Sequence, residues 1–426
     1  MEGKPGTGSE FCKGAIGLKM AMQSMRPAWL LAAALLLGAL GTAQAQPNCR
    51  NTGAFEPWLA AFKKEALAQG ISPSALTAAA PYMVFDQRIV NIDRGQRFFA
   101  QDFVEMSEKM LVRAGRLSSG PAQLKKHQAL FAKEEKDFGV PGAVITAFWA
   151  LESDFGAGQG KDPAIKSLTT LAYDCRRSDM FRGHLFNALR LIERGDLRAE
   201  EMIGSWAGEL GQTQMMPSEY MAHAIDYDGD GRRNLITSAA DVIGSTGKYL
   251  VHLGWKRGEP WLQEIRVPAN FPWKEADLSV KYPRSKWAAW GVTRADGKPI
   301  PSDNMPASVV LPVGRFGPAF LAYDNFQAYL GWNNSLNYSL VAAYLATRID
   351  GAPAMSKGSG PIPKITFDET REVQQLLEKR GYDVGRIDGV LGLKSRTAIR
   401  DVQIKVGLPA DGWPTAELLA ALRAGK

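Results

Sequence analysis

The chain has 426 residues, of which 45% are hydrophobic and 22% charged, with a formal net charge of +7. This composition is typical of globular protein, and the length allows two or three domains. Few cysteines and four histidines without ligand spacing exclude a zinc site. The mild positive charge suits an anionic polymer but is equally compatible with a protein that binds none, and we predict no nucleic-acid partner.

Residues 1–45 have the features of a secretory signal peptide. Arg26 precedes a run without charges over residues 29–40, and Ala43-Gln44-Ala45 supplies small residues at the cleavage spacing. The run is too short to span a bilayer. We predict cleavage after the last of these alanines and a soluble periplasmic protein without a membrane anchor. Met1–Lys19 is then either a non-native leader or the product of an upstream start codon.

Cleavage there leaves two cysteines, Cys49 and Cys175. In an oxidising compartment such a pair more often forms a disulfide bond than two free thiols. We therefore predict a disulfide bond between Cys49 and Cys175.

The rest of the sequence predicts a mainly α protein of the α+β class. Residues 50–135 have the 3.6-residue apolar period of packed helices, and residues 139–255 form a second helical block. Between 259 and 320 the pattern changes to β-like segments separated by prolines, glycines and tryptophans, which favours a small inserted β-subdomain. Helical periodicity returns over residues 338–349.

The C-terminal part is predicted to form a domain of its own. Residues 351–365 are rich in glycine, proline and serine, which indicates a linker. Residues 366–426 contain short apolar segments separated by Asp-Gly turns, which predicts a separate three-helix domain. The main domain is then expected to cover residues 46–350.

The segment Val140–Gly156 contains the strongest candidate for chemistry. Residues 143–151 are apolar on every side apart from one threonine, and a helix without a polar face is a buried helix. Glu152 ends this helix, where burial opposes ionisation and lets a carboxyl group hold a proton near neutral pH. From this segment alone, a glutamate on a last, exposed helical turn is the alternative.

The segment Ser205–Tyr220 combines glycines, amides and hydroxyls with methionine and tryptophan. Hydrogen-bonding groups beside apolar faces are what a sugar-binding cleft requires. Taken singly, each of these residues is better explained as part of a structural loop. Taken together, they favour a cleft.

A third segment begins like an EF-hand calcium loop. Asp226, Asp228 and Asp230 occupy positions 1, 3 and 5, and glycine occupies position 6. Arg232 offers its backbone carbonyl at position 7, whereas Thr237 replaces the glutamate of position 12. We expect a structural calcium ion of weak affinity; an Asp/Gly turn without an ion is the alternative.

Together, Ala150–Gly156 and Gly208–Ser218 resemble the lytic transglycosylases of the membrane-bound lytic transglycosylase B type, which are periplasmic enzymes that cleave peptidoglycan. The resemblance covers about residues 50–350 and implies a lysozyme-like catalytic core with Glu152 as its single acid/base and no catalytic cofactor. It implies Asp241 as the closing ligand of a lengthened calcium loop. It also implies contacts to the glycan from Ser205, Gln214 and Asn333, and to the peptide stem from Arg176 and Arg177.

The sequence departs from the family next to Asn333, where Trp332 stands in place of the usual tyrosine. Asp154 is a poor second carboxylate, because it points about 200° away from Glu152 on the same helix. The resemblance therefore implies that Glu152 first protonates the oxygen between N-acetylmuramic acid and N-acetylglucosamine. It then takes a proton from the C6 hydroxyl of the same muramoyl residue, which leaves a 1,6-anhydromuramoyl end.

Residues 366–424 are similar to the small peptidoglycan-binding domain of many cell-wall hydrolases, which implies a second, tethering contact with the same polymer. The predicted partners are glycan strands and peptide stems, with other cell-wall enzymes as further candidates, and the predicted state is a monomer. A hydrolytic muramidase and a non-catalytic wall-binding scaffold are the alternative functions.

Overall fold

The computed structural model describes residues 53–95, 101–112 and 115–425. The predicted signal peptide and Cys49 lie outside these residues, so the signal peptide and the Cys49–Cys175 disulfide stay predictions. Within the described ranges, no helix is both long enough and apolar enough to cross a membrane.

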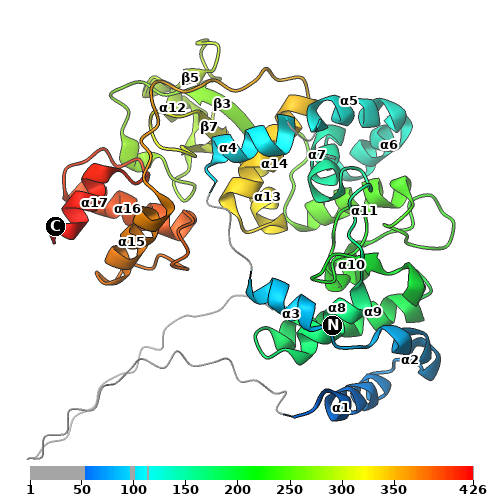
Figure 1. Ribbon diagram of the computed structural model, residues 1–426. Helices are drawn as coiled ribbons and strands as arrows, with labels where there is room; N and C mark the ends of the chain where they lie inside the picture. Colours follow the sequence, from blue (N-terminus) through cyan, green and yellow to red (C-terminus); the bar gives the residue numbers. More distant parts are fainter. Residues whose placement is uncertain (1–52, 96–100, 113–114, 426) are drawn as a thin grey trace, which may run out of the picture. The chain divides into compact units, whose positions relative to one another are not determined.

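The first helices pack against two helices from the middle of the chain (Figure 1). The predicted helical period is confirmed in α1, whose buried face contains Phe62, and the ring of Phe62 stacks on Phe186 with 4.7 Å between centroids. Ser72 caps α2 by accepting a hydrogen bond from the backbone N–H of Ala75. This group consists of α1 (Phe55–Ala68), α2 (Pro73–Ala79), the 3₁₀ helix Ala80–Tyr82, α3 (Gln87–Arg94), α8 (Ala164–Tyr173) and α9 (Ser178–Glu193).

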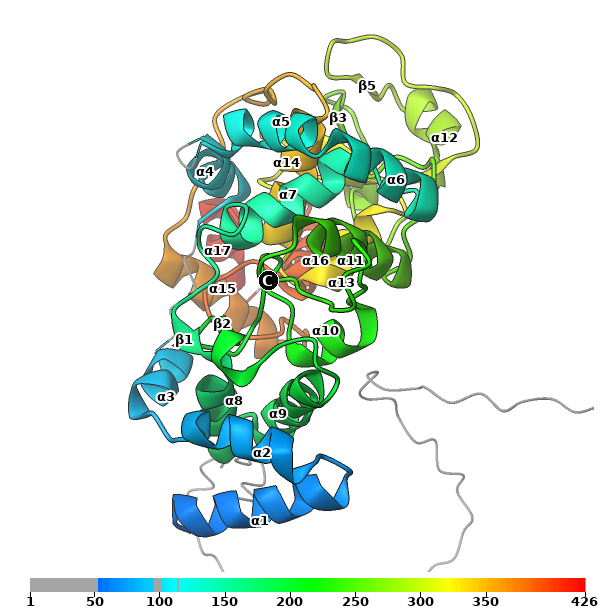
Figure 2. The same cartoon turned by 90° about the vertical axis from the view of Figure 1, so that its right-hand side faces the viewer.

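Helix α7 (Gly142–Ser153) lies among other helices, as predicted for a helix without a polar face (Figure 2). Every residue from Ala143 to Leu151 is buried, and Pro141 precedes the first helical residue. Around α7 are α5, α6, α11 and α14, and these four belong to the largest hydrophobic core. The helices of this region are α4 (Phe103–Ser107), a π-helical turn (Glu108–Val112), α5 (Arg116–Lys126), α6 (Gln128–Phe138), α10 (Pro217–His223), α11 (Ala239–His252), α13 (Phe326–Trp332) and α14 (Leu336–Ile349).

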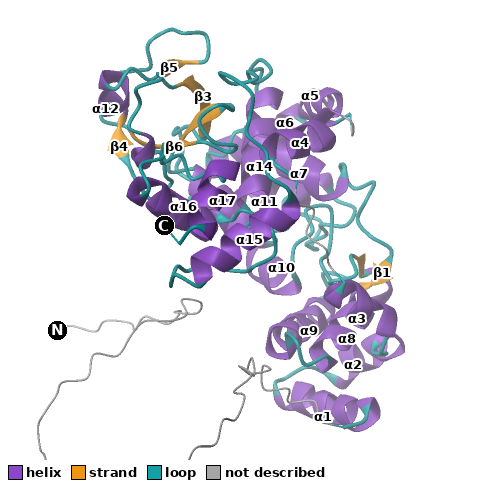
Figure 3. Cartoon of the chain, turned by 60° about the vertical axis from the view of Figure 1, so that its left-hand side comes forward, coloured by secondary structure: helices purple, strands orange, loops and turns teal. Residues whose placement is uncertain are grey.

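The predicted β-subdomain is confirmed (Figure 3), and it has a core of its own that includes fully buried Trp287. Its antiparallel sheet has the strand order β4-β6-β7-β3-β5, and Val309 pairs with Leu321 in the register between β6 and β7. A separate two-stranded sheet joins β1 and β2, and a short 3₁₀ helix (Ala199–Glu201) precedes β2. The remaining elements are β1 (Asp162–Pro163), β2 (Ile203–Gly204), β3 (Leu262–Arg266), the 3₁₀ helix Trp273–Glu275, β4 (Tyr282–Pro283), α12 (Arg284–Ala289), β5 (Thr293–Arg294), β6 (Pro306–Val310) and β7 (Ala319–Ala322).

The C-terminal three-helix domain is also confirmed, with a third hydrophobic core. It consists of α15 (Phe367–Glu378), α16 (Leu393–Lys405) and α17 (Ala416–Arg423). Thr366 and Glu369 form a capping box at the start of α15, in which each side chain accepts a backbone N–H of the other residue.

The segment predicted to be a linker is bonded to the rest of the chain. The N–H of Ser356 donates to Glu264 at 2.7 Å, and the N–H of Ser359 donates to the carbonyl of Phe316 at 2.8 Å. On α16, Arg396 is only 6% exposed and donates to the carbonyl of Pro312 at 2.7 Å. Arg400 likewise donates to the carbonyl of Ala276. The C-terminal domain is therefore docked on the β-subdomain through buried arginines, which the composition of the linker did not predict.

Glu134 on α6 is a buried carboxyl group with an unusual environment. It faces α11 at Gly247, where a Cβ would lie 2.0 Å from Glu134 Oε1, so only glycine fits. Neither of its oxygens has a hydrogen-bond partner among the described residues. Burial, together with the charges of Glu135 and Asp137, raises its pKa to about 9.

We expect Glu134→Gln to stabilise the protein increasingly as pH rises. Between its ordinary pKa of 4.5 and about 9, the folded chain keeps a proton on Glu134 that the unfolded chain releases. Stability therefore falls with pH across this window, by up to about 1.4 kcal/mol per pH unit. Urea unfolding at pH 5 and pH 8 measures the effect. If the free energies of unfolding of variant and wild type differ by the same amount at pH 5 and at pH 8, the raised pKa of Glu134 is contradicted.

Candidate active site

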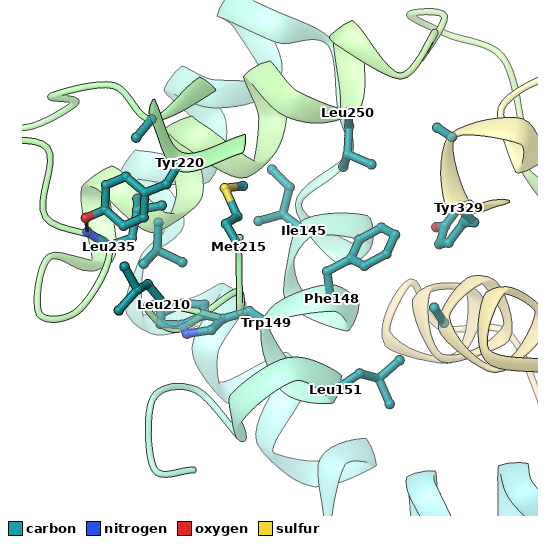
Figure 4. Packing of buried hydrophobic residues seen from close by; sticks show 14 of the residues in the cluster. Ile145, Phe148, Trp149, Leu151, Leu210, Met215, Tyr220, Leu235, Leu250 and Tyr329 are labelled. Carbon is teal, nitrogen blue, oxygen red and sulfur yellow. Dashed lines mark hydrogen bonds between the residues drawn. The ribbon is translucent and has the colours of Figure 1, made fainter. Parts of the chain in front are cut away.

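Glu152 occupies the last turn of α7, where it is half-buried and the packing around the helix removes much of the water from its carboxyl group. Side chains of α7 point outward in several directions, toward Leu210, Met215, Leu250 and Tyr329 of the surrounding segments (Figure 4). This burial raises the pKa of Glu152 to about 7, and the negative charge of Glu209 acts in the same direction. The group can thus both hold and release a proton near neutral pH.

Two side chains donate hydrogen bonds to Glu152 and partly offset the effect of burial on its pKa. The indole Nε1 of Trp332 donates to Oε1 at 2.8 Å, and the hydroxyl of Tyr338 donates to the same oxygen. The ring of Phe148, one turn earlier on α7, stacks on Trp332 with 4.3 Å between centroids. The helix therefore positions both the carboxyl group and one of its donors.

Glu152 faces a cavity of about 270 Å³. The cavity combines carboxyl, amide and hydroxyl groups with aromatic and methionine side chains, the combination that favours a sugar ligand. Its lining comes from the end of α7, the loop after β2, α10, α11 and the end of α13. The lining residues are Glu152, Glu209, Thr213, Gln214, Met215, Met216, Glu219, Tyr249, Gly331, Trp332 and Asn333.

Gln212 holds the loop after β2 against α7. Its Oε1 accepts a hydrogen bond from Trp149 Nε1 at 2.8 Å, and its carbonyl accepts one from Ser153 Oγ at 2.5 Å. The chain leaves α7 through left-handed backbone at Asp154, Phe155 and Gly156, with φ of 48°, 61° and 92°. A Cβ at Gly156 would lie 2.7 Å from Gln212 Oε1, so the contact requires glycine there.

The structure brings two of the predicted glycan-binding residues together with Glu152. Gln214 and Asn333 line the cavity, and Gln214 has left-handed backbone, with φ of 49°. The Gln214 amide nitrogen donates to the carbonyls of Gly211 and Gln159. Ser205 is not among the described residues that line the cavity, but its hydroxyl donates to Glu209 Oε2 at 2.9 Å.

Arg176 and Arg177 lie at the turn between α8 and α9. Both guanidinium groups pair with Asp93 of α3, whose side chain is 1% exposed. The arginine side chains remain 40% and 37% exposed, and neither belongs to the described lining of the cavity. Arg177 still acts on the site electrostatically, because its charge lowers the pKa of Glu209 against the effect of burial.

The predicted calcium ligands divide into two groups. Oxygen atoms of Asp226, Asp228 and Asp230 all lie within 4.8 Å of one another, a spacing that fits a cation held by hard oxygen ligands. The carboxylate of Asp241 is turned toward the loop backbone, where it accepts N–H groups of Tyr227 at 2.7 Å and Asn234 at 2.6 Å. The side chain of Arg232 donates to Glu201 and to the carbonyl of Asp196.

Comparison with known proteins gives the family. Residues 54–347, more than half of the chain, match the sequence profile described as "Transglycosylase SLT domain". The chain belongs to the transglycosylase SLT domain family. In this SLT-domain chain, residues 368–422 also match the profile described as "Putative peptidoglycan binding domain".

The chain is similar to solved structures of this family. SltB3 from Pseudomonas aeruginosa, solved in complex with NAG-NAM-pentapeptide and with NAG-anhNAM-pentapeptide, is 38% identical. That match covers 87% of this chain and 100% of SltB3, with a TM-score of 0.81. SltB1 from the same organism is 27% identical over 70% of this chain and 100% of SltB1, with a TM-score of 0.60.

A curated relative is the membrane-bound lytic murein transglycosylase B of Escherichia coli (strain K12), which is 29% identical over 215 residues. The match covers 50% of this chain. The chain thus spans 58% of the length of that relative.

Sequence reasoning missed several groups of this SLT domain. It left the role of Trp332 open, and the indole proves to donate to Glu152. The sequence predicts Tyr338 only as part of the helix over residues 338–349. It predicts Glu209 and Glu219 only as parts of the segment Ser205–Tyr220, without a role of their own. Of these residues, only Glu209 lies within a segment that carries the resemblance, Gly208–Ser218, and this position is the one signal that could have found it. Asp154, predicted to be a poor second carboxylate, pairs with Arg116 at 2.7 Å.

We expect Tyr338→Phe to raise the pKa of Glu152 in the SLT domain above about 7, because a hydrogen bond to a carboxylate stabilises the ionised form. NMR titration of the ¹³C-labelled side-chain carboxyl carbon of Glu152 measures the change. Tyr249→Phe is the matched control, since Tyr249 lines the same cavity and no bond from it to Glu152 is found among the described residues. An unchanged or lower pKa in Tyr338→Phe would refute the role of that hydroxyl.

Proposed function

We propose that the protein is a lytic transglycosylase that cleaves the β-1,4 bond between N-acetylmuramic acid and N-acetylglucosamine in peptidoglycan. The observation that carries this proposal is Glu152, a desolvated carboxyl group with a pKa of about 7 at the wall of a polar and aromatic cavity. The similarity to SltB3, which covers 87% of this chain and which was solved with NAG-NAM-pentapeptide and NAG-anhNAM-pentapeptide, supports the substrate.

The proposed reaction uses one carboxyl group twice. Glu152 gives its proton to the glycosidic oxygen as the bond to C1 breaks, and the acetamido group of the muramoyl residue shelters the positive charge. The C6 hydroxyl oxygen then bonds to C1, and its proton passes to Glu152. The product ends in 1,6-anhydromuramic acid, and no step requires water or a cofactor. Hydrogen bonds from Trp332 and Tyr338 stabilise Glu152 while it is ionised.

Gln214 and Asn333 are proposed to contact the glycan, since both line the cavity with Glu152. Ser205 is proposed to take part through Glu209, to which it donates. Arg176 and Arg177 are proposed to meet carboxylates of the peptide stem with the exposed parts of their guanidinium groups.

The profile match over residues 368–422 supports wall binding by the C-terminal domain. We propose the boundaries 46–350 for the catalytic domain and 366–426 for this second domain, with the segment 351–365 between them. We propose that the predicted signal peptide exports the protein to the periplasm, where peptidoglycan lies. We also propose that the protein acts there as a monomer. Other cell-wall enzymes remain candidate partners.

Glu152→Gln is expected to reduce the release of soluble fragments from purified peptidoglycan by roughly 100-fold or more, because glutamine cannot donate and recover the proton. Binding to insoluble peptidoglycan should persist. Mass spectrometry of the wild-type digest should show anhydro ends, which are one water lighter than hydrolysed ends. Asp154→Asn is the control and should keep the same products.

Substantial lysis by Glu152→Gln would remove Glu152 from the mechanism. Wild-type products that carry the additional water would instead support a hydrolytic muramidase. Binding without any cleavage by the wild type would support a wall-binding scaffold.

We also propose that Asp226, Asp228 and Asp230 hold a structural calcium ion, because their oxygens converge in one exposed loop. Calcium should then raise the melting temperature relative to EDTA, with a stabilisation of about 1.4 kcal/mol at ten times Kd. Asp226→Asn should abolish this difference, whereas Asp296→Asn, in a different loop, should retain it. A wild-type melting temperature that is equal in calcium and EDTA would count against the site.

A further inference from the structure

Glu209 is a second carboxyl group that faces the cavity of Glu152. It belongs to the loop after β2, and the next residue, Leu210, pairs with Met215 across that loop. Burial raises the pKa of Glu209, whereas the hydroxyl of Ser205 and the guanidinium of Arg177 lower it. The pKa of Glu209 is raised overall, and these two groups limit the rise and so favour the ionised form of this half-buried carboxyl group.

Ser205 fixes the orientation of Glu209. The Ser205 oxygen accepts hydrogen bonds from the N–H groups of Ala207 at 3.1 Å and Glu209 at 3.3 Å. With both lone pairs used, its hydroxyl hydrogen is directed to Glu209 Oε2, 2.9 Å away. The loop backbone therefore holds one carboxylate oxygen through the serine.

Charged and ionisable groups reach Glu152 from several elements. Glu209 opposes its ionisation, and Tyr338 of α14 and Arg116 of α5 favour it. Arg116 also pairs with Asp154, so part of its charge is already compensated. Glu219 of α10 and Tyr249 of α11 complete the ionisable groups of the described cavity lining.

We propose that Glu209 is a positioning residue that keeps the transferable proton on Glu152, and that Ser205 acts by holding Glu209 in place. The inference rests on the proposed function and adds a second carboxylate to it. Asp154 cannot take this role, because it pairs with Arg116 outside the described lining of the cavity.

The negative charge of Glu209 assists both halves of the reaction. Before cleavage, repulsion between two neighbouring carboxylates keeps Glu152 protonated and ready to act as an acid. When Glu152 has given its proton to the glycosidic oxygen, the same repulsion makes it a stronger base toward the C6 hydroxyl.

The test compares Glu209→Gln with Glu219→Gln over pH 5 to 9. Removal of the Glu209 charge should move the basic limb of kcat/KM to lower pH, so that activity is near wild type at pH 5 and roughly three- to tenfold lower at pH 8. Glu219→Gln removes another carboxylate of the cavity that is not among the main influences on Glu152. The basic limb of the kcat/KM profile of Glu219→Gln should lie at the same pH as in the wild type, even if the value of kcat/KM changes.

Ser205→Ala supplies a second variant. Without the hydroxyl, Glu209 ionises less readily, so the basic limb should again move to lower pH, by less than in Glu209→Gln. The double variant should shift no further than Glu209→Gln alone. NMR titration of the Glu152 carboxyl carbon gives the same information without turnover and shows whether a variant is folded.

A basic limb and a Glu152 pKa that stay unchanged in Glu209→Gln would overturn the inference, as would equal shifts in Glu209→Gln and Glu219→Gln. Failure of the proposed function has a different signature. In that case the wild type itself releases no anhydro products, while the NMR titration still reports whether Glu209 acts on Glu152.

Discussion

The burial of an all-apolar helix is the constraint on which the site depends. Because α7 has no polar face, it is stable only when other helices surround it, and the packing carries the carboxyl group at its end out of water. Nearby groups then adjust the acidity of Glu152. Trp332, Tyr338 and Arg116 favour ionisation, and Glu209 opposes it. The balance leaves a group that can exchange a proton near neutral pH.

The segments that meet at the end of α7 are fixed by backbone conformations that are unfavourable on their own. Asp154, Phe155 and Gln214 have left-handed backbone without being glycines, and such residues cost of order 1–3 kcal/mol each. The hydrogen bonds of Gln212 to Trp149 and Ser153 offset this cost by joining the loop to the helix. These bonds hold the loop against the helix in the absence of a ligand, and a pre-formed arrangement of this kind reduces the ordering needed for binding.

The sequence predicted those features that depend on local pattern. The buried helix with its terminal glutamate, the β-subdomain and the three-helix domain could each be predicted from the composition of a short stretch of sequence, and the structure contains all three. It could not predict contacts between distant residues, such as the bond from Tyr338 to Glu152, 186 positions away. Arg396 and Arg400 illustrate the same limit, because arginines on a short helix suggest an exposed face until the surface that covers them is known.

Trp332 and Tyr338 both donate a hydrogen bond to the same oxygen of Glu152, Oε1. The two oxygens of the carboxyl group therefore have different environments. An oxygen that already accepts two hydrogen bonds is a poor site for a proton, so the protonated form of Glu152 is expected to carry its proton on Oε2, which has no hydrogen-bond partner among the residues described. In the proposed reaction, Oε1 anchors the carboxyl group through these two hydrogen bonds, and Oε2 delivers and recovers the proton. In that reaction, departure and return of the proton would both use Oε2, and the carboxyl group would not need to rotate between them.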